Sequence, residues 1–155
     1  LRQRCKEVKH INVQLHTTVS MLNILDIGEV YEFSRNQYQK FHYFDTEARA
    51  PHGYINILPH INIVDFPRYY HIRHLPVELK HQAVKQIELT YNRVKGTIEN
   101  SWEQDNLNNL NNLAKIIMED RDPHRWDQFL DVQRASDKFR KLKGSDYLPW
   151  MSQYV

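Results

Sequence analysis

The sequence predicts an α/β fold: the closing β–α units of a partial (β/α) barrel, followed by a helical C-terminal cap. Three observations predict it. Residues 10–20 alternate between apolar and polar side chains, a helical pattern begins at once near Asp26, and a second strand opens at His60 with the same His-Ile-Asn start as the first. A strand that feeds a crossover helix usually belongs to a parallel sheet.

The polar face of the first strand is its most informative feature. Its polar residues share one side because successive side chains of a strand point to opposite faces: Asn12, Gln14, His16, Thr18 and Ser20. Parallel strands are normally apolar on both faces, so we expect this face to line a ligand-holding interior. Ser20 and Asn23 then lie at the strand's C-terminal end, where α/β barrels place their sites. An edge strand with one solvated face is the alternative.

The next segments are predicted from helix-capping residues and from prolines and a glycine that interrupt regular structure. Asp26 and Glu29 form a helix-opening box, and the helical spacing continues to about residue 39. Residues 40–59 contain prolines and a glycine, which predicts a long loop with a short strand at 54–58. The second strand covers residues 60–64.

Three further helices form the C-terminal half. They open at Pro76, at the Ser101–Gln104 box and at Asp122-Pro123, and the last ends before Gly144. A short turn or helix at 147–151 closes the chain. Their expected inward-facing residues are Leu79, Ala83, Val84, Ile87, Tyr91, Val94, Leu107, Leu110, Leu113, Ile117, Trp126, Phe129, Leu130 and Phe139.

Length and composition bound the function. The 155 residues suit one domain or part of a larger one, and the net charge of +2 is too small to indicate nucleic acid or a membrane surface. No apolar run is long enough for a membrane span. The single cysteine, Cys5, favours a reducing, cytoplasmic setting. Because the chain starts at Leu1 with what resembles the end of a helix, we expect a fragment that lacks its N-terminal part.

Two arrangements of candidate metal-binding or catalytic residues are not favoured by the sequence. His71 and His74, with Asp65 nearby, have helical ligand spacing but lie in a loop, and zinc needs three or four convergent ligands. We therefore predict no metal site there. A Ser20–His16 dyad is excluded because the strand rise separates the two residues by roughly 13 Å. No catalytic residue is predicted in this chain.

The loop of residues 66–74 mixes arginines and histidines with aromatic side chains. Such a composition occurs in grooves that bind single-stranded nucleic acid. No extended basic stripe accompanies it elsewhere in the chain, so a nucleic-acid partner is not expected, and the aromatic residues serve equally well to roof a pocket.

A family resemblance supports the barrel. Residues 16–33, with Thr-Val-Ser ahead of Asn23 and a helix, look like the late-barrel segment of radical S-adenosylmethionine enzymes. Residues 61–76 and the tail at 129–150 resemble a phage and marine-bacterial branch with a shortened C-terminal "twitch" region. The resemblance implies two parts: residues 1–95 as barrel units and residues 96–155 as the helical cap.

The resemblance also implies the cofactors and the site. The intact protein would bind S-adenosylmethionine and a [4Fe–4S] cluster, whose cysteine ligands would lie in the missing N-terminal half. Cofactor-binding residues would be Ser20, Asn23, Val64 and Asp65. Residues facing an unknown substrate would be Gln14, His16 and Thr18. The chain alone would be inert.

Two other classes remain open. One is a small binding module that uses residues 66–74 to hold nucleic acid or protein, and the other is a purely structural protein of phage type. Two strands alone make a weak sheet, which favours the hypothesis that the chain is a fragment of a larger protein.

Overall fold

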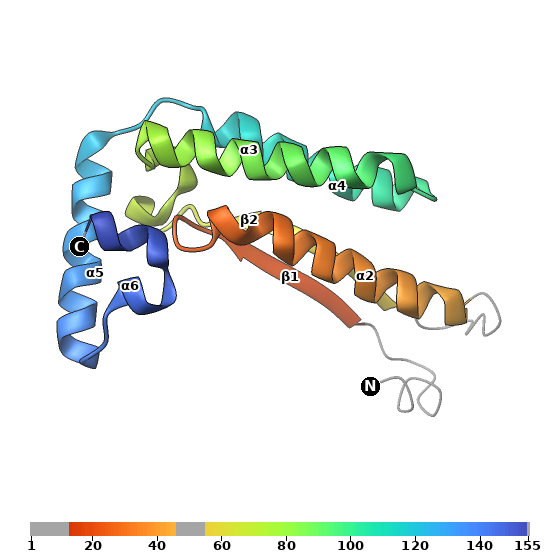
Figure 1. The fold of residues 1–155 in the computed structure, drawn as a ribbon, viewed down its shortest axis with the longest axis horizontal. Helices are drawn as coiled ribbons and strands as arrows, with labels where there is room; N and C mark the ends of the chain where they lie inside the picture. The colour runs from red at the N-terminus through yellow and green to blue at the C-terminus, as the bar shows by residue number, and fades with distance from the viewer. Residues whose placement is uncertain (1–12, 46–54, 155) are drawn as a thin grey trace.

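The computed structural model describes residues 13–45 and 55–154 (Figure 1). Its two strands, β1 (Val13–Val19) and β2 (Ile55–Ile63), pair in parallel. The α-helices are α2 (Ile27–Asp45), α3 (Val77–Val94), α4 (Ser101–Ile117), α5 (Pro123–Arg140) and α6 (Gly144–Tyr147). Short 3₁₀ turns are η1 (Ile24–Asp26), η2 (Arg68–Tyr70), η3 (Ile72–His74), η4 (Lys95–Thr97) and η5 (Pro149–Gln153). The described chain is therefore mostly helical with a small parallel sheet, an α/β arrangement in the loose sense.

The helices are stacked on one side of the sheet. α2 and α4 contact β2, and α3 packs against both α2 and α4. Figure 1 shows α3 and α4 side by side as an outer layer, with α5 running across one end of that pair. α5 contacts η2 and η3, so the segment after β2 is held between the sheet and the last long helix.

The strand register contains one irregularity beside a proline. Gln14 aligns with Asn56, but the next residue, Leu15, aligns with Pro59. Proline has no backbone N–H to give to a neighbouring strand, so it is tolerated in a sheet at edges and bulges. From Pro59 onward the pairing is regular, and His16 aligns with His60.

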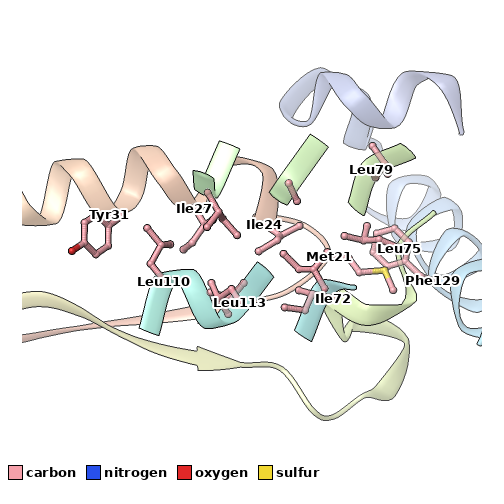
Figure 2. Close-up of a cluster of buried hydrophobic side chains, with 14 of the residues drawn as sticks. Met21, Ile24, Ile27, Tyr31, Ile72, Leu75, Leu79, Leu110, Leu113 and Phe129 are labelled. Atoms are coloured by element: carbon pink, nitrogen blue, oxygen red, sulfur yellow. The ribbon is translucent and has the colours of Figure 1, made fainter. Parts of the chain in front are cut away.

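One hydrophobic core joins the sheet to the helices. Its buried members come from β1, from the turn and η1 after it, from the η3 region and from α2, α3, α4, α5 and η5. Figure 2 shows Leu110 and Leu113 beside Ile27, then Ile24, Met21 and Ile72, while Leu75, Leu79 and Phe129 continue the cluster toward α5. The core contains residues from both 1–95 and 96–155, and the proposed division at residue 95 stays a prediction.

Two boundaries expected from the sequence are wrong. Residues 40–45 belong to α2, and residues 55–63 form one strand in place of a loop with two short strands. The aromatic residues at 41–44 led to the loop prediction, but proline and glycine first appear at Pro51 and Gly53. Aromatic side chains lower helix propensity only slightly, and tertiary context overrides such a preference. The expected strand start at residues 10–12 lies outside the described residues.

Two details of the C-terminal helices also differ. α4 is capped by Asn100, whose Oδ1 accepts a hydrogen bond from Glu103 N at 3.0 Å, so the expected box at Ser101–Gln104 is displaced by one residue. Phe139 was expected to face inward but is 89% exposed. It lies in the last turn of α5, beyond the part of this helix that packs on the core. Trp126, Phe129 and Leu130 are buried as expected.

None of the helices in the described ranges combines the length and the apolar character that a membrane span requires.

Candidate functional site

The candidate site lies where the two parallel strands end side by side. Val64 N donates to Val19 O at 2.9 Å, so the residues that follow the two strands are neighbours. Met21 N donates to Tyr70 O at 3.0 Å, which brings the segment after β2 to the same edge. Ligands of open α/β sheets bind at this carboxyl edge. The structure therefore brings Ser20, Asn23, Val64 and Asp65 to one end of the sheet.

Asn23 shapes the turn after β1. Its Oδ1 accepts from Ser20 N at 2.9 Å, and its Nδ2 donates to Thr18 O at 2.9 Å. Ser20 Oγ in turn accepts from Leu22 N at 3.2 Å. Asn commonly closes turns in this way, because its side chain can imitate a backbone peptide group. The amide that the sequence assigned to a ligand is thus used to hold the chain where β1 meets η1.

Asp65 is the most available polar group at this edge. Its carboxylate is 88% exposed, and its Oδ1 lies 3.5 Å from Nε2 of His71. Burial, followed by the positive charge of Arg73, lowers the pKa of His71, so this imidazole is neutral at pH 7. The contact between them is therefore weaker than a charge pair, and the carboxylate can still accept hydrogen bonds from a ligand.

His74 has a structural position behind the site. It is 4% exposed, and its Nδ1 accepts from Asp122 N at 3.1 Å, which joins η3 to the start of α5. Burial and then the charge of Arg73 lower its pKa to about 4. Its ring centroid lies 5.9 Å from that of His71. Among the described residues no group of three or more His, Cys, Asp or Glu side chains converges on a metal position.

The basic and aromatic segment 66–74 is divided between surface and interior. Phe66 is 86% exposed, and Arg68 is also exposed. Tyr70 instead packs edge-on against Phe129, with ring centroids 5.7 Å apart, and its hydroxyl accepts from Gln133 at 3.0 Å. Ile72 is fully buried. Much of this segment therefore serves to attach η2 and η3 to α5.

The polar face of β1 is open in the described part of the chain. His16 and Thr18 are exposed, and so are His60 and Asn62 on β2, while Val19 on the opposite face is buried. The backbone of Gln14 pairs with β2, and its side chain lies outside the described set. The alternative of an edge strand with one solvated face thus describes what this structure shows, and an enclosed interior would need further chain.

Two polar features were not expected from the sequence. The first is a pocket of about 520 Å³ between α2, α3 and η5. It contains none of the predicted site residues, and its lining comes from three distant segments: Leu25, Asp26, Gly28, Glu29, Glu32, Gln82, Gln86, Thr90, Arg93, Pro149 and Trp150. No local pattern in the sequence could have brought these residues together.

The second is a buried ion pair between α2 and α4. Arg35 Nη2 lies 3.2 Å from Glu103 Oε2, and the two side chains are 9% and 1% exposed. Glu103 Oε2 also accepts from Glu99 N at 3.1 Å, and Arg35 donates to Thr97 O. Burial raises the pKa of the adjacent Tyr31 to about 12. The pair joins α2 to α4 and includes no predicted site residue.

Comparison of the chain with protein-family models, with curated proteins and with solved structures found no match.

Proposed function

We propose that this chain supplies the late strands of a partial barrel in a radical S-adenosylmethionine enzyme. The observation that carries the proposal is the parallel β1–β2 pair, which brings Ser20, Val64 and Asp65 to one carboxyl edge. Barrel enzymes build their sites at that edge. The observed fold is a two-stranded parallel sheet packed against helices. The barrel that these strands would complete is part of the proposal.

The residues at the edge fit S-adenosylmethionine in part. The exposed carboxylate of Asp65 can accept hydrogen bonds from amino or hydroxyl groups of the cofactor, and Ser20 can offer its hydroxyl. Asn23 would position Ser20 rather than touch the cofactor, because both ends of its amide already bond to the turn. His16 and Thr18, with Gln14, would face the unidentified substrate across the open side of the sheet.

The [4Fe–4S] cluster does not fit the described residues. Such a cluster needs cysteine thiolates, and the described ranges contain none. The ligands would belong to an N-terminal half of the same protein, which is the partner that the proposal requires. We place this enzyme in the cytoplasm, where thiolate ligands stay reduced.

The proposal is tested by the coding sequence upstream of Leu1. We expect an open frame that carries Cys-x-x-x-Cys-x-x-Cys. The extended protein, purified without oxygen, should show the absorption of an iron–sulfur cluster and release 5′-deoxyadenosine from S-adenosylmethionine. A start codon directly before Leu1, or an extended protein without a cluster, would overturn it.

Within the extended protein, Asp65→Asn is the matched test of the site. We expect weaker binding of S-adenosylmethionine with the cluster content unchanged. Asp131→Asn on the exposed face of α5 is the control, because its carboxylate is 77% exposed and lies on another element. If both substitutions changed the affinity for S-adenosylmethionine equally, Asp65 would not be a cofactor-binding residue.

A small binding module is the second candidate, favoured by one observation. Phe66 and Arg68 are exposed together at the end of β2, where an aromatic ring and a cation are available to an unstacked base. Its test is the anisotropy of a labelled single-stranded oligonucleotide. A salt-dependent signal that Phe66→Ala and Arg68→Ala abolish would support this candidate. No signal for the unchanged chain would reject it.

A further inference from the structure

The C-terminal end of α5 combines positive charge with exposed apolar side chains. Four of the six residues 138–143 are cations: Lys138, Arg140, Lys141 and Lys143. All four are exposed, and none of them pairs with a carboxylate in the described part of the chain. Between them lie Phe139 and Leu142, which are 89% and 47% exposed. No other large apolar side chain of the described residues is as exposed as Phe139.

The turn that follows α5 fixes how these side chains are presented. Lys141 has a φ of 55°, the left-handed conformation that commonly ends a helix. Leu142 N donates to Asp137 O at 3.1 Å, and Gly144 N donates to Asp137 Oδ2 at 2.7 Å. In such turns the residue after the left-handed one often packs on an apolar side chain of the last helical turn. The residues at those positions are Ser136 and Asp137, neither of which is apolar, and Leu142 stays exposed.

Residues 138–143 lie at an extremity of the molecule. Figure 1 shows that α5 starts beside the α3–α4 pair and ends far from it, at the turn that leads to α6. An end of this kind can approach an extended flat surface. Cations attract anionic lipid headgroups, and apolar side chains between them gain by leaving water for the boundary between headgroups and acyl chains. Lysine and arginine stems can lie along such an apolar boundary while their charges stay in water.

We propose that residues 138–143 attach this protein to an anionic lipid surface, with Phe139 and Leu142 entering the headgroup region. The net charge of the whole chain, +2, does not reveal this surface, because acidic residues elsewhere balance the cations. A single-stranded nucleic acid would use the cations and the Phe139 ring, but it would leave Leu142 without a role. The two apolar side chains together therefore favour lipid. This inference is independent of the proposed enzyme function.

The test is sedimentation of the full, tag-free chain with lipid vesicles. We expect it to bind phosphatidylcholine vesicles that contain about 30% phosphatidylserine, and not vesicles of phosphatidylcholine alone. Binding should fall when NaCl is raised from about 0.1 M to about 0.5 M, because salt screens the cations. Phe139→Ser should weaken binding about fivefold or more, since the aromatic ring no longer leaves water.

The Lys141→Gly variant separates the charge from the turn. Glycine is the residue that a left-handed position favours, so this variant should unfold at the same or a higher temperature than the unchanged chain. Its binding to vesicles should nevertheless fall about fivefold, because one cation is lost. The matched controls are Phe33→Ser on α2 and Lys85→Gln on α3, which remove an exposed aromatic ring and an exposed cation elsewhere. Both should bind vesicles as the unchanged chain does.

The proposal is overturned if the unchanged chain does not bind the anionic vesicles, or if Phe139→Ser and Lys141→Gly bind them as well as the controls do. If a labelled single-stranded oligonucleotide binds instead, and both substitutions weaken that binding, the surface belongs to nucleic acid. If sedimentation velocity shows a dimer that Phe139→Ser dissociates, and no vesicle binding, the surface belongs to a second copy of the chain.

Discussion

At the scale of single residues, several polar side chains that resemble ligands are occupied by the fold. Asn23 closes the turn after β1, and His74 accepts a hydrogen bond from the start of α5. Both were singled out by residue type and spacing. Residue type shows which hydrogen bonds a side chain can make, but not whether backbone groups have already taken them.

Asn23→Ala tests the structural role of this turn. Two hydrogen bonds are lost and Ser20 N loses its partner, so we expect the free energy of unfolding to fall by about 1–3 kcal/mol in urea denaturation. Asn23→Asp keeps the acceptor for Ser20 N but loses the donor to Thr18 O, and it should give an intermediate loss. A change below about 0.5 kcal/mol for Asn23→Ala would leave the amide available for a ligand.

His74 should make stability depend on pH. Its folded pKa of about 4 lies below the ordinary value of 6.5, so between these values the unfolded chain binds a proton that the folded chain does not. Above pH 6.5 the imidazole is neutral in both states, and its contribution to the free energy of unfolding is fully present. As the pH falls from 6.5 toward 4, that free energy should fall by about 3 kcal/mol.

The measurement is the free energy of unfolding from pH 7 to pH 4, compared with His74→Asn. Carboxylates titrate in both proteins, so the difference between the two curves isolates the imidazole. The unchanged chain should lose more stability than the variant over this range. Parallel curves would mean that His74 is protonated in the folded chain as easily as in the unfolded one.

At the scale of elements, close packing and one buried ion pair fix the position of α2. Gly28 lies where α2 passes α3, and a Cβ at this position would lie 2.5 Å from Oγ1 of Thr90. About two turns further along the helix, Arg35 pairs with Glu103 of α4 in the interior. These contacts hold the helix that links the two strands in the sequence.

Gly28→Ala should destabilise the chain although alanine favours a helix. The overlap with Thr90 costs about 1–3 kcal/mol, which outweighs a propensity gain of about 1 kcal/mol. Thr90→Ala removes the obstructing oxygen and leaves its Cβ at 3.5 Å from the added carbon. The Gly28→Ala/Thr90→Ala double variant should therefore be more stable than the two single effects predict. Additive effects in thermal unfolding would contradict the close approach.

Glu103→Ala should be strongly destabilising. It leaves the charge of Arg35 buried without its partner, which costs about 3–5 kcal/mol. Replacing both residues by Leu and Met should cost less than Glu103→Ala alone. Asp131→Ala, which removes the exposed partner of Arg134, is the control and should change stability by about 0–1 kcal/mol. A similar small loss for Glu103→Ala would show that solvent reaches the pair.

At the scale of the whole molecule, the core is continuous from the sheet to α5. Ile24 and Ile27 belong to the same buried cluster as Leu110 and Leu113, so residues on both sides of position 95 share one core (Figure 2). A chain with one shared core normally unfolds in a single step.

The expected result is one cooperative transition in urea. Trp102, Trp126 and Trp150 all lie beyond residue 95, so fluorescence reports on that part, while circular dichroism reports on all helices. The two curves should coincide. Separate midpoints would instead support a division into barrel units and a helical cap.

The sequence by itself determined where α3, α4 and α5 lie, most of their buried residues and most of β1, because periodic apolar side chains select helix or strand locally; β2 is one strand where the sequence predicted two short ones. The tertiary structure alone decided which polar groups remain available. The open face of β1, the occupied amide of Asn23, the buried Arg35–Glu103 pair and the unpaired cations at the end of α5 depend on what packs or pairs across from each residue. Those neighbours come from distant parts of the chain, and no local pattern contains them.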